Sequence, residues 1–452
     1  MKFSCSSLCL VLLLVSGPAN AQNAGPGAGE DLPRHGIVGL VVAPADSAKP
    51  EDAQANPPTV KNVVPRGAGE AAGIQPGDTL LELDGKQIAA STSFAQEIGH
   101  HLAGDSVQIV LWRAGQKMEK TVILKPRPFE TSPNATILYR SITAGGSQRR
   151  TIITHPQSPG RHPAVLLVGG LGCYSLDGTL NESRGYGPIL SALVKEEFVT
   201  MRVEKTGEGD SEGPACSDPK ATAELEASGY AAALDALRSY DFVDPKEIFV
   251  FAHSLGPLLA SLALPGKNIR GVIAAETIGR SWFEYTQENL RRQSTLVGEP
   301  LDQVDADVRA HVHCAYHFYL LHESSDDVAK LGKTCKGMIA SNAGMSDAYM
   351  QQIGDINLAK QWKQIEAPVL VIYGTSDPAT SADEGQYLAG IINSFHPGNA
   401  TYREIAGMGH EFGRYDSQLA FLKEVGNISK PHPFDEEVVT VVLVWLKQHL
   451  PS

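Results

Sequence analysis

The segment around Ser254 constrains the fold of this chain more than any other. Residues 249–252 form an apolar run rich in aromatic and β-branched side chains, which indicates a buried strand. Ser254 lies between the small residues Ala252 and Gly256, and residues 257–264 have the apolar pattern of a helix. A serine on such a strand–turn–helix segment is pushed out at the carboxyl edge of a sheet. The segment predicts this arrangement, and the alternative is an ordinary strand-to-helix turn.

Two later segments supply side chains that such a serine needs. Residues 368–374 form a second apolar run, long enough for a buried parallel strand, and Asp377 lies just beyond it. Residues 401–405 indicate a short strand, and a glycine-flanked loop with His410 follows. A serine hydroxyl is a weak nucleophile until an imidazole takes its proton and a carboxylate orients that imidazole. The chain order therefore predicts a catalytic triad. Taken singly, Asp377 would open a turn and His410 would be a solvated loop histidine.

An oxyanion hole is expected beside the serine. Residues 163–168 indicate an early buried strand, and a glycine-rich loop follows it directly. Negative charge on a tetrahedral intermediate needs fixed donors, of which one is the amide after the nucleophile, here Leu255. The second donor is expected to be the amide of Leu171, with Gly170 as the neighbouring alternative. A glycine-rich turn without a donor role is the other interpretation.

From about residue 135 to the end, the chain resembles an α/β-hydrolase of the serine aminopeptidase and dienelactone-hydrolase-like group. The segments that carry the resemblance are residues 168–173, 203–213, 252–256, 374–377 and 407–410. The resemblance implies an α/β fold class, with a mostly parallel sheet and a helical cap at about residues 278–362. It says little about substrate, because this fold supports many activities.

Residues 35–126 differ in pattern from the rest of the chain. They contain an early glycine loop and a Gly-x-x-Pro-Gly-Asp segment at residues 73–78, followed by Asp84-Gly85. With these features the region resembles a PDZ domain of the type found beside bacterial periplasmic proteases. The resemblance implies a small β-rich domain that pairs an extended peptide with a strand starting near Leu40. The carboxylate of a peptide or protein C-terminus would be held by the loop amides of Gly36, Ile37, Val38, Gly39 and Leu40. Alternatively the cleft is empty, and the domain only spaces or docks the hydrolase.

The start of the chain has the features of a signal peptide over residues 1–21. We expect a disordered leader over residues 22–34, a linker over residues 127–134, and the hydrolase domain over residues 135–452. No apolar run after the signal is long enough to span a bilayer, so no stable membrane insertion is expected. The mature protein is expected to be exported, to a bacterial periplasm or as a secreted protein.

Cysteine usage fits an oxidising compartment. Two of the six cysteines lie in the signal peptide, which leaves Cys173, Cys216, Cys314 and Cys335. The first two follow strands at the carboxyl edge of the sheet, so we expect a Cys173–Cys216 disulfide. A Cys314–Cys335 disulfide would then cross-link the cap. No metal-ligand spacing is found, and no cofactor is expected.

The net charge and the residues near the active site limit which binding partners are expected. The formal charge of −13 argues against nucleic acid as a partner. The aromatic residues Trp282 and Tyr285 belong to the expected cap, where they either pack in the core or line a pocket for an apolar or aromatic group. Glu204 follows a strand on the active-site side. It would either bind a substrate amino terminus or cap the next turn.

These features predict an exported serine hydrolase that cleaves an ester or amide bond through an acyl-enzyme, with a PDZ module for peptide or partner binding. The expected substrate is a small ester, amide or peptide. Two alternatives remain open from the sequence. One is an aminopeptidase-type serine peptidase. The other is a PDZ-mediated binding or scaffold protein whose hydrolase domain is not essential.

Overall fold

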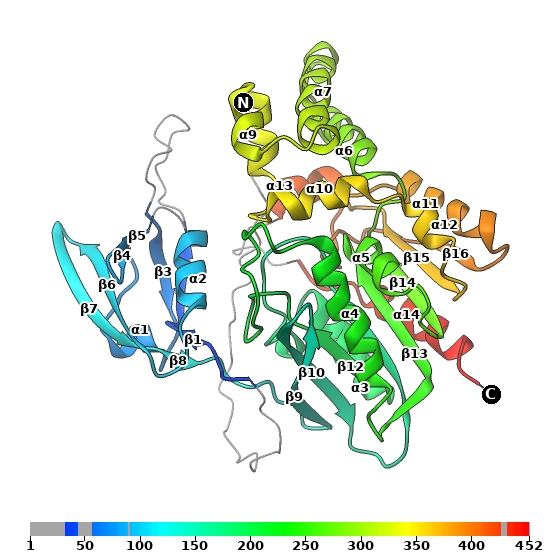
Figure 1. Cartoon of the computed structure of the whole chain (residues 1–452), viewed down its shortest axis with the longest axis horizontal. Coiled ribbons are helices and arrows are strands. Elements are labelled where there is room, and N and C mark those ends of the chain that lie inside the picture. The colour runs from blue at the N-terminus through cyan, green and yellow to red at the C-terminus, as the bar shows by residue number, and fades with distance from the viewer. Residues whose placement is uncertain (1–31, 44–56, 89–90, 426–431, 452) are drawn as a thin grey trace. The chain divides into compact units, whose positions relative to one another are not determined.

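The computed structural model describes residues 32–43, 57–88, 91–425 and 432–451 (Figure 1). The chain divides between Phe129 and Glu130 into two compact units. The predicted signal peptide lies outside the described residues. So does most of the predicted leader.

The first unit is a small β-rich domain. Its main sheet has the order β2-β3-β4-β6-β7, with β5 paired to β4, and a separate ribbon pairs β1 with β8. Side chains of β6 that point inward, among them Val107 and Ile109, are fully buried. The elements are β1 (Gly36–Ile37), β2 (Leu40–Ala43), β3 (Thr59–Val63), α1 (Ala68–Ala71), β4 (Thr79–Leu83), β5 (Lys86–Gln87), α2 (Ser91–Gly99), β6 (Ser106–Arg113), β7 (Gln116–Ile123) and β8 (Lys125–Pro126).

The end of the predicted leader is part of this packed unit. Leu32 is buried, and Arg34 donates through Nη2 to the carbonyl of Arg127 at 2.7 Å. His35 forms a β-bridge with Leu102. The expectation of disorder is therefore corrected for residues 32–34, because burial and backbone pairing hold them.

The second unit is built on an eight-stranded sheet of order β16-β15-β14-β13-β11-β12-β10-β9. Strand β10 runs antiparallel to β9 and β12, and the other neighbours pair in parallel. This order is that of an α/β-hydrolase, so the predicted fold class is confirmed. The strands are β9 (Ala135–Ala144), β10 (Ser147–Pro156), β11 (His162–Val168), β12 (Val199–Val203), β13 (Val243–His253), β14 (Gly271–Ala275), β15 (Val369–Gly374) and β16 (Ala400–Ile405).

Helices cover both faces of this sheet (Figure 1). Along β13, Val250 and Ala252 join one apolar cluster with α4, α5 and α12, whereas Phe249 and Phe251 join another with α3 and α14. This alternation is the period of two that a strand buried on both faces requires. The helices are α3 (Tyr186–Lys195), α4 (Ala223–Leu237), α5 (Gly256–Ala263), α12 (Ala382–Phe395), α13 (Gln418–Glu424) and α14 (Glu436–Gln448), with a 3-10 turn, η1 (Thr179–Asn181).

A helical cap separates β14 from β15. It comprises α6 (Trp282–Leu296), α7 (Leu301–Ala315), η2 (Tyr316–Leu320), α8 (Ser325–Lys330), α9 (Lys333–Ala340), α10 (Asp347–Asp355) and α11 (Leu358–Trp362). A Cys314–Cys335 disulfide joins α7 to α9, with Cα atoms 5.1 Å apart. The other disulfide, Cys173–Cys216, joins the loops after β11 and β12. Both pairs are those expected from the sequence.

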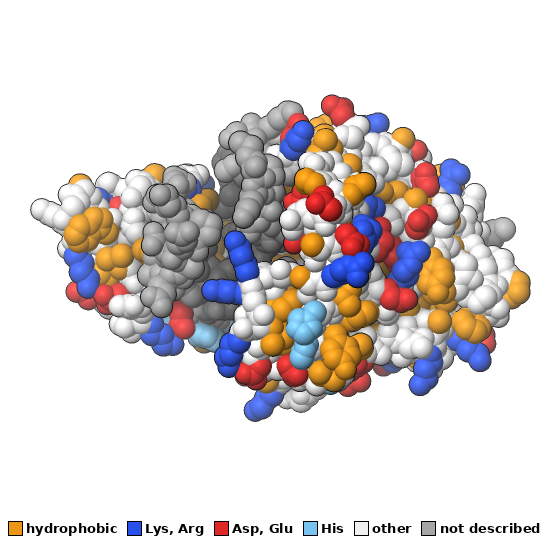
Figure 2. Space-filling model, turned by 90° about the horizontal axis from the view of Figure 1, so that it is seen from above, with side chains coloured by type: hydrophobic (Ala, Val, Ile, Leu, Met, Phe, Trp, Pro, Cys, Tyr) orange, Lys and Arg blue, Asp and Glu red, His pale blue; other side chains and the backbone are white. Residues whose placement is uncertain are grey.

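The surface carries charge of both signs. On the face of the hydrolase unit seen in Figure 2, acidic and basic side chains are interspersed with apolar ones. No helix within the described residues combines the length and the apolar character needed to cross a membrane.

The predicted linker contains a residue that anchors the second unit. Glu130 forms an ion pair with Arg202 of β12, and both side chains are completely buried. Arg202 also donates to the carbonyl of Leu176 at 3.0 Å, and Glu130 accepts from the amide of Leu180 at 2.9 Å. The expectation of a plain linker is corrected at this position, because a buried carboxylate with these partners is part of the core.

Replacing Arg202 with Met should lower the free energy of unfolding by about 3–5 kcal/mol, because it leaves the Glu130 charge buried and unpaired. Denaturant unfolding measures the loss. The double variant Arg202→Met with Glu130→Gln is the control and should recover part of it. A loss below about 1 kcal/mol for Arg202→Met alone would contradict the assignment.

Candidate active site

The turn between β13 and α5 holds Ser254 in a strained conformation. Its φ is +60°, in the left-handed region that residues with a side chain rarely adopt. The Ser254 amide donates to the carbonyl of Ala275 at 2.9 Å, which fixes the turn against β14. A Cβ atom on Gly256 would lie 2.5 Å from the Val168 carbonyl oxygen, so this position requires glycine.

The structure brings Ser254, His410 and Asp377 together. His410 Nε2 lies 3.0 Å from Ser254 Oγ, and His410 Nδ1 lies 2.8 Å from Asp377 Oδ2. Asp377 follows β15 and His410 follows β16, and each side chain reaches the serine from a loop beyond its strand. The Asp377 side chain is completely buried, and that of His410 is 19% exposed. The three groups form one continuous chain of hydrogen bonds.

Electrostatics favour an ionised Asp377. Burial by itself would raise the pKa of this carboxyl, but the His410 imidazole and the Thr380 hydroxyl hold it below its ordinary value. The Asp377 carboxylate also accepts from the amide of Ala379 at 2.6 Å and from the hydroxyl of Thr380 at 2.8 Å. Burial would lower the pKa of His410, yet the charge of Asp377 and its hydrogen bond leave that pKa above its ordinary value. The carboxylate therefore stabilises the imidazolium.

A second carboxyl group lies behind the first. Glu276 follows β14 directly, is completely buried, and has a φ of +50°. One of its carboxyl oxygens lies within 4.8 Å of a carboxylate oxygen of Asp377 and of a ring nitrogen of His410. Burial, and next the charge of Asp377, raise the pKa of Glu276 well above its ordinary value. This shift favours the neutral form of Glu276, in which it adds no charge repulsion against Asp377.

His253 holds the backbone of His410. His253 Nε2 lies 2.8 Å from the His410 carbonyl oxygen, and Nδ1 lies 2.8 Å from the hydroxyl of Tyr186. Burial, followed by the nearby His410, lowers the pKa of His253 to about 3, so its ring is neutral. A carbonyl only accepts, so Nε2 carries the proton and Nδ1 accepts from Tyr186. His253 thus helps to hold the loop that carries His410 in place.

The glycine-rich loop after β11 lies against the serine. A Cβ atom on Gly170 would lie 2.9 Å from the Cβ of Ser254, which shows how closely the two backbones approach. Leu171 and Leu255 both line the cavity in front of Ser254. Within the described residues, the amides of Leu171 and Leu255 have no backbone acceptor. Their role as donors to an oxyanion stays a prediction.

The cavity in front of Ser254 has a volume of about 140 Å³. An apolar cavity of about 150 Å³ accepts benzene, so this space fits a short acyl or aromatic group. The side chains that line it are Leu171, Ser254, Leu255, Ile278, Trp282, Tyr285, Ala379, Thr380 and His410. Trp282 and Tyr285 thus lie where a pocket wall was expected. Their polar atoms are already engaged, because Trp282 Nε1 donates to Tyr319 at 3.0 Å and Tyr285 donates to the Ala379 carbonyl at 2.7 Å.

Glu204 does not line this cavity. Its buried carboxylate accepts from the hydroxyl of Ser175 at 2.6 Å and from the amides of Leu176 and Asp177 at 2.8 and 3.0 Å. This placement corrects the expectation that Glu204 binds substrate, because the carboxylate is turned into the backbone of a neighbouring loop.

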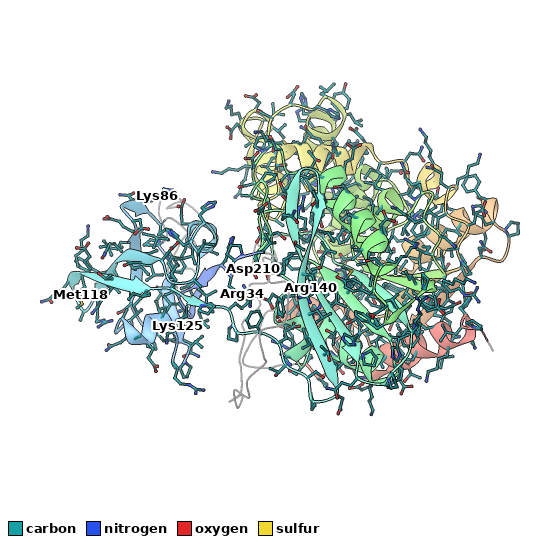
Figure 3. The ribbon with its side chains drawn as sticks, turned by 60° about the horizontal axis from the view of Figure 1, so that its bottom comes forward. Arg34, Lys86, Met118, Lys125, Arg140 and Asp210 are labelled. Carbon is teal, nitrogen blue, oxygen red and sulfur yellow. A yellow bond between two sulfur atoms is a disulfide. The ribbon has the colours of Figure 1, made fainter. Side chains whose placement is uncertain are left out.

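The nearby Asp210 is also held inside the protein. Asp210 accepts from Nε of Arg150 at 3.3 Å, and both side chains are buried. Arg150 in turn donates to the carbonyl of Arg140 at 3.4 Å. Asp210 and Arg140 are both labelled in Figure 3. Asp210 is therefore a structural partner of β10.

The predicted carboxylate-binding loop of the first unit is partly engaged within its own domain. The Gly36 amide donates to the His101 carbonyl at 2.9 Å, and Gly36 and Ile37 pair with β8. Gly36 therefore cannot hold a peptide carboxylate, which corrects that assignment. Val38 is buried, Gly39 has a φ of +75°, and Leu40 begins β2 at the edge of its sheet. Among the described strands, β2 lies at the edge of its sheet, which is where an added strand would pair.

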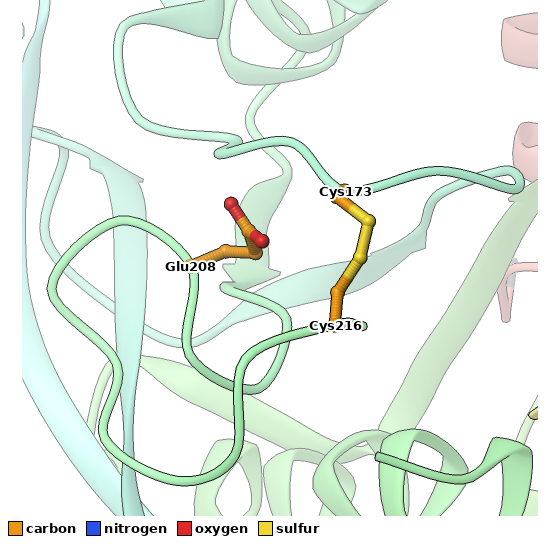
Figure 4. Close-up of side chains that lie close together, drawn as sticks. All are labelled: Cys173, Glu208 and Cys216. Carbon is orange, nitrogen blue, oxygen red and sulfur yellow. A yellow bond between two sulfur atoms is a disulfide. The ribbon is translucent and has the colours of Figure 1, made fainter. Parts of the chain in front are cut away.

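Two clusters of possible metal ligands occur within the described residues. One is Glu276, Asp377 and His410, which the hydrogen-bond chain already occupies. The other is Cys173, Cys216 and Glu208 (Figure 4). Both sulfur atoms of this cluster are joined in the disulfide, so they are not thiolate ligands.

Sequence reasoning missed side chains that hold the backbone of the site. Tyr186 supports His253, and Lys205 donates to the carbonyl of Gly170 at 2.6 Å. The sequence shows Lys205 as a cation two residues after the end of β12 and two before Gly207, but its burial, which requires a specific partner, is seen only in the structure. Tyr186 carries no signal in the sequence, since its partner lies 67 residues away.

Comparisons with known proteins identify the first unit. Residues 39–124 match the family model described as a PDZ domain. A Vibrio cholerae protein named as a zinc metalloprotease is 39% identical over 81 residues, which are 18% of this chain and 17% of that protein. A magnetosome formation protease of Magnetospirillum gryphiswaldense is 26% identical over 156 residues, which are 33% of this chain and 19% of that protein. The chain thus spans less than a fifth of the length of either relative.

Solved structures resemble the second unit at low identity. An esterase of Pyrococcus furiosus has a TM-score of 0.44 and 15% identity, over 72% of this chain and 97% of that chain. A proline iminopeptidase of Mycobacterium smegmatis has a TM-score of 0.42 and 18% identity, over 69% of this chain and 98% of that chain. Because both TM-scores lie below 0.5, the fold is assigned from the strand order. The chain combines a PDZ domain with an α/β-hydrolase domain.

Replacing Glu204 with Gln should lower the free energy of unfolding by about 1–3 kcal/mol, because hydrogen bonds to a charged acceptor become weaker. It should leave KM for a substrate with a free amino terminus nearly unchanged. Denaturant unfolding and steady-state kinetics measure the two effects. A large rise in KM for such substrates, with unchanged stability, would instead show that Glu204 binds the substrate.

Proposed function

We propose that this protein is a serine hydrolase that cleaves a neutral carboxylic ester or amide through an acyl-enzyme. The observation that best supports the proposal is the unbroken hydrogen-bond chain from Asp377 Oδ2 through His410 to Ser254 Oγ. An aspartate that orients an imidazole beside a serine hydroxyl is the arrangement that activates the serine as a nucleophile.

In the proposed reaction, Ser254 Oγ attacks the substrate carbonyl carbon while its proton passes to His410 Nε2. The carbonyl oxygen becomes an oxyanion that accepts from the amides of Leu255 and Leu171. The bond to the leaving alcohol or amine then breaks, and that group takes the proton from His410. A water molecule repeats the sequence on the acyl-enzyme and releases the acid. Asp377 stays ionised throughout and stabilises the protonated His410.

The cavity favours a neutral acyl group. None of the described side chains that line the cavity is an Asp, Glu, Lys or Arg. A substrate ammonium placed there would lose its hydration without gaining a carboxylate partner. The engaged carboxylate of Glu204 removes the main reason to expect an aminopeptidase. We therefore favour an ester or amide with a short uncharged acyl chain.

We further propose that the protein is exported and that its PDZ domain binds an extended peptide along β2. The signal-like residues 1–21 and the two disulfides are what an exported protein would carry. The edge position of β2 permits strand addition. The two relatives that match part of the chain are named as proteases, which act on polypeptides, and this supports a peptide as the partner.

Replacing Ser254 with Ala should lower kcat/KM for short acyl nitrophenyl esters by at least about 10⁴-fold, because the nucleophile is lost. Fluorescent fluorophosphonate labelling should disappear in the same variant. The control is Ser394→Ala, which removes an exposed helix hydroxyl and should behave as wild type. Equal esterase activity in the Ser254 variant and wild type would refute the proposal. A folded wild-type protein that takes no label would favour a scaffold role.

The pH dependence of kcat/KM should show an acid limb with a midpoint above pH 6.5, the ordinary value for histidine. Protonated His410 cannot accept the Ser254 proton, so activity is present above its pKa and is lost as the pH falls through it. Glu411 contributes to the raised pKa, so Glu411→Gln should move the midpoint down. A midpoint at or below pH 6.5 in the wild type would contradict the electrostatic account.

A further inference from the structure

Lys205 is a buried cation directly beneath the glycine-rich loop. It follows β12, and its side chain is 2% exposed. Its Nζ donates to the carbonyl of Gly170 at 2.6 Å and lies 3.1 Å from Oε1 of Glu226. It also lies 4.8 Å from the centre of the Tyr174 ring. A lysine is rarely buried so completely unless its charge is paired, as it is here with Glu226.

The carbonyl of Gly170 belongs to the same peptide unit as the amide of Leu171. In a planar trans peptide the C=O and N–H bonds point in opposite directions. A group that fixes the carbonyl therefore fixes the direction of the amide. The Gly170 carbonyl accepts from Lys205 and, at 3.1 Å, from the hydroxyl of Tyr174. With two donors on the carbonyl, the Leu171 amide is held pointing the opposite way, and Leu171 is one of the residues that line the cavity beside Ser254.

The charge of Lys205 also polarises this peptide. A hydrogen bond from an ammonium is stronger than one from a neutral donor, and hydrogen bonds in a chain strengthen one another. The Glu226 carboxylate that pairs with Lys205 also accepts from Tyr230 at 3.0 Å and from Tyr349 at 2.9 Å. The neighbouring Arg149 is a second buried cation within reach of the Glu226 charge. The Glu226 charge is therefore shared between two buried cations.

We propose that Lys205 is a positioning residue of the oxyanion hole, which acts through the Gly170–Leu171 peptide. Its ammonium orients and polarises that peptide, so the Leu171 amide is a stronger donor to the oxyanion than to the ground-state carbonyl. The inference rests on the proposed serine hydrolase function. The competing role is an ion pair with Glu226 that only stabilises the core.

A pair of variants separates the two roles. Glu226→Gln and the double variant Lys205→Met with Glu226→Gln both lack the ion pair, but only the double variant lacks the donor to Gly170. The double variant leaves no buried charge unpaired at these two positions. The readouts are kcat and KM for a short acyl nitrophenyl ester and Ki for phenylboronic acid, which forms a tetrahedral adduct with an active-site serine. Lys195→Met, at an exposed position, is the surface control and should match wild type.

We expect kcat of the double variant to be at least about 10-fold below that of Glu226→Gln, with KM changed by less than about 3-fold. Loss of an oxyanion donor costs about 10²–10³-fold, and loss of its support should cost less. The Ki for phenylboronic acid should rise by the same factor as kcat/KM falls. Tyr174→Phe removes the other donor to the Gly170 carbonyl and should change kcat and Ki in the same direction, by about 2–5-fold.

A folded double variant with the kcat and Ki of Glu226→Gln would overturn the inference and leave Lys205 a structural ion-pair partner. If the double variant does not fold, folded Tyr174→Phe with unchanged kcat and Ki overturns it equally. Failure of the proposed function has a different signature. In that case the wild type itself neither hydrolyses the ester nor binds the boronate, and the proposed role of Lys205 is refuted together with the proposed function.

Discussion

The close approach of two backbones organises this site. Strands β11 and β13 are parallel neighbours, so the loops beyond them meet at the same edge of the sheet. The loop after β11 passes so near the turn at Ser254 that Gly170 and Gly256 have no room for a Cβ atom in the present backbone. This contact places Gly170 directly against the side chain of Ser254, which has a positive φ. The rest of the site is built around that contact.

Buried polar groups keep the surrounding loops in place. His253 fixes the backbone of the His410 loop, and Lys205 fixes the peptide between Gly170 and Leu171. The Glu204 carboxylate holds the next part of the same loop, because it accepts hydrogen bonds from the backbone amides of Leu176 and Asp177. A buried polar group is tolerated only when its hydrogen bonds are made. These side chains therefore hold the loops more firmly than apolar packing alone would do.

The sequence predicts the fold and the order of the three site residues because those depend on local patterns. Ser254, Asp377 and His410 each follow a recognisable strand, and parallel strands bring their carboxyl ends to one edge. The orientation of a side chain beyond a strand depends on tertiary packing, which explains the error at Glu204. The same limit applies to Gly36, whose amide donates a hydrogen bond to the carbonyl of His101, 65 residues further along the chain. Glu130 lies in a proline-rich stretch, and only its distant partner Arg202 places it in the core.

The most direct measurement is the site of covalent labelling in the intact protein. Wild-type protein and the His410→Ala variant would be treated with a fluorophosphonate, and the adducts located by peptide mass spectrometry. Our account predicts a single adduct on Ser254 in the wild type and a greatly slowed reaction in the variant, because the hydroxyl loses its base. An adduct on a different residue, or equal labelling rates in both proteins, would contradict the assignment of Ser254 as a nucleophile activated by His410.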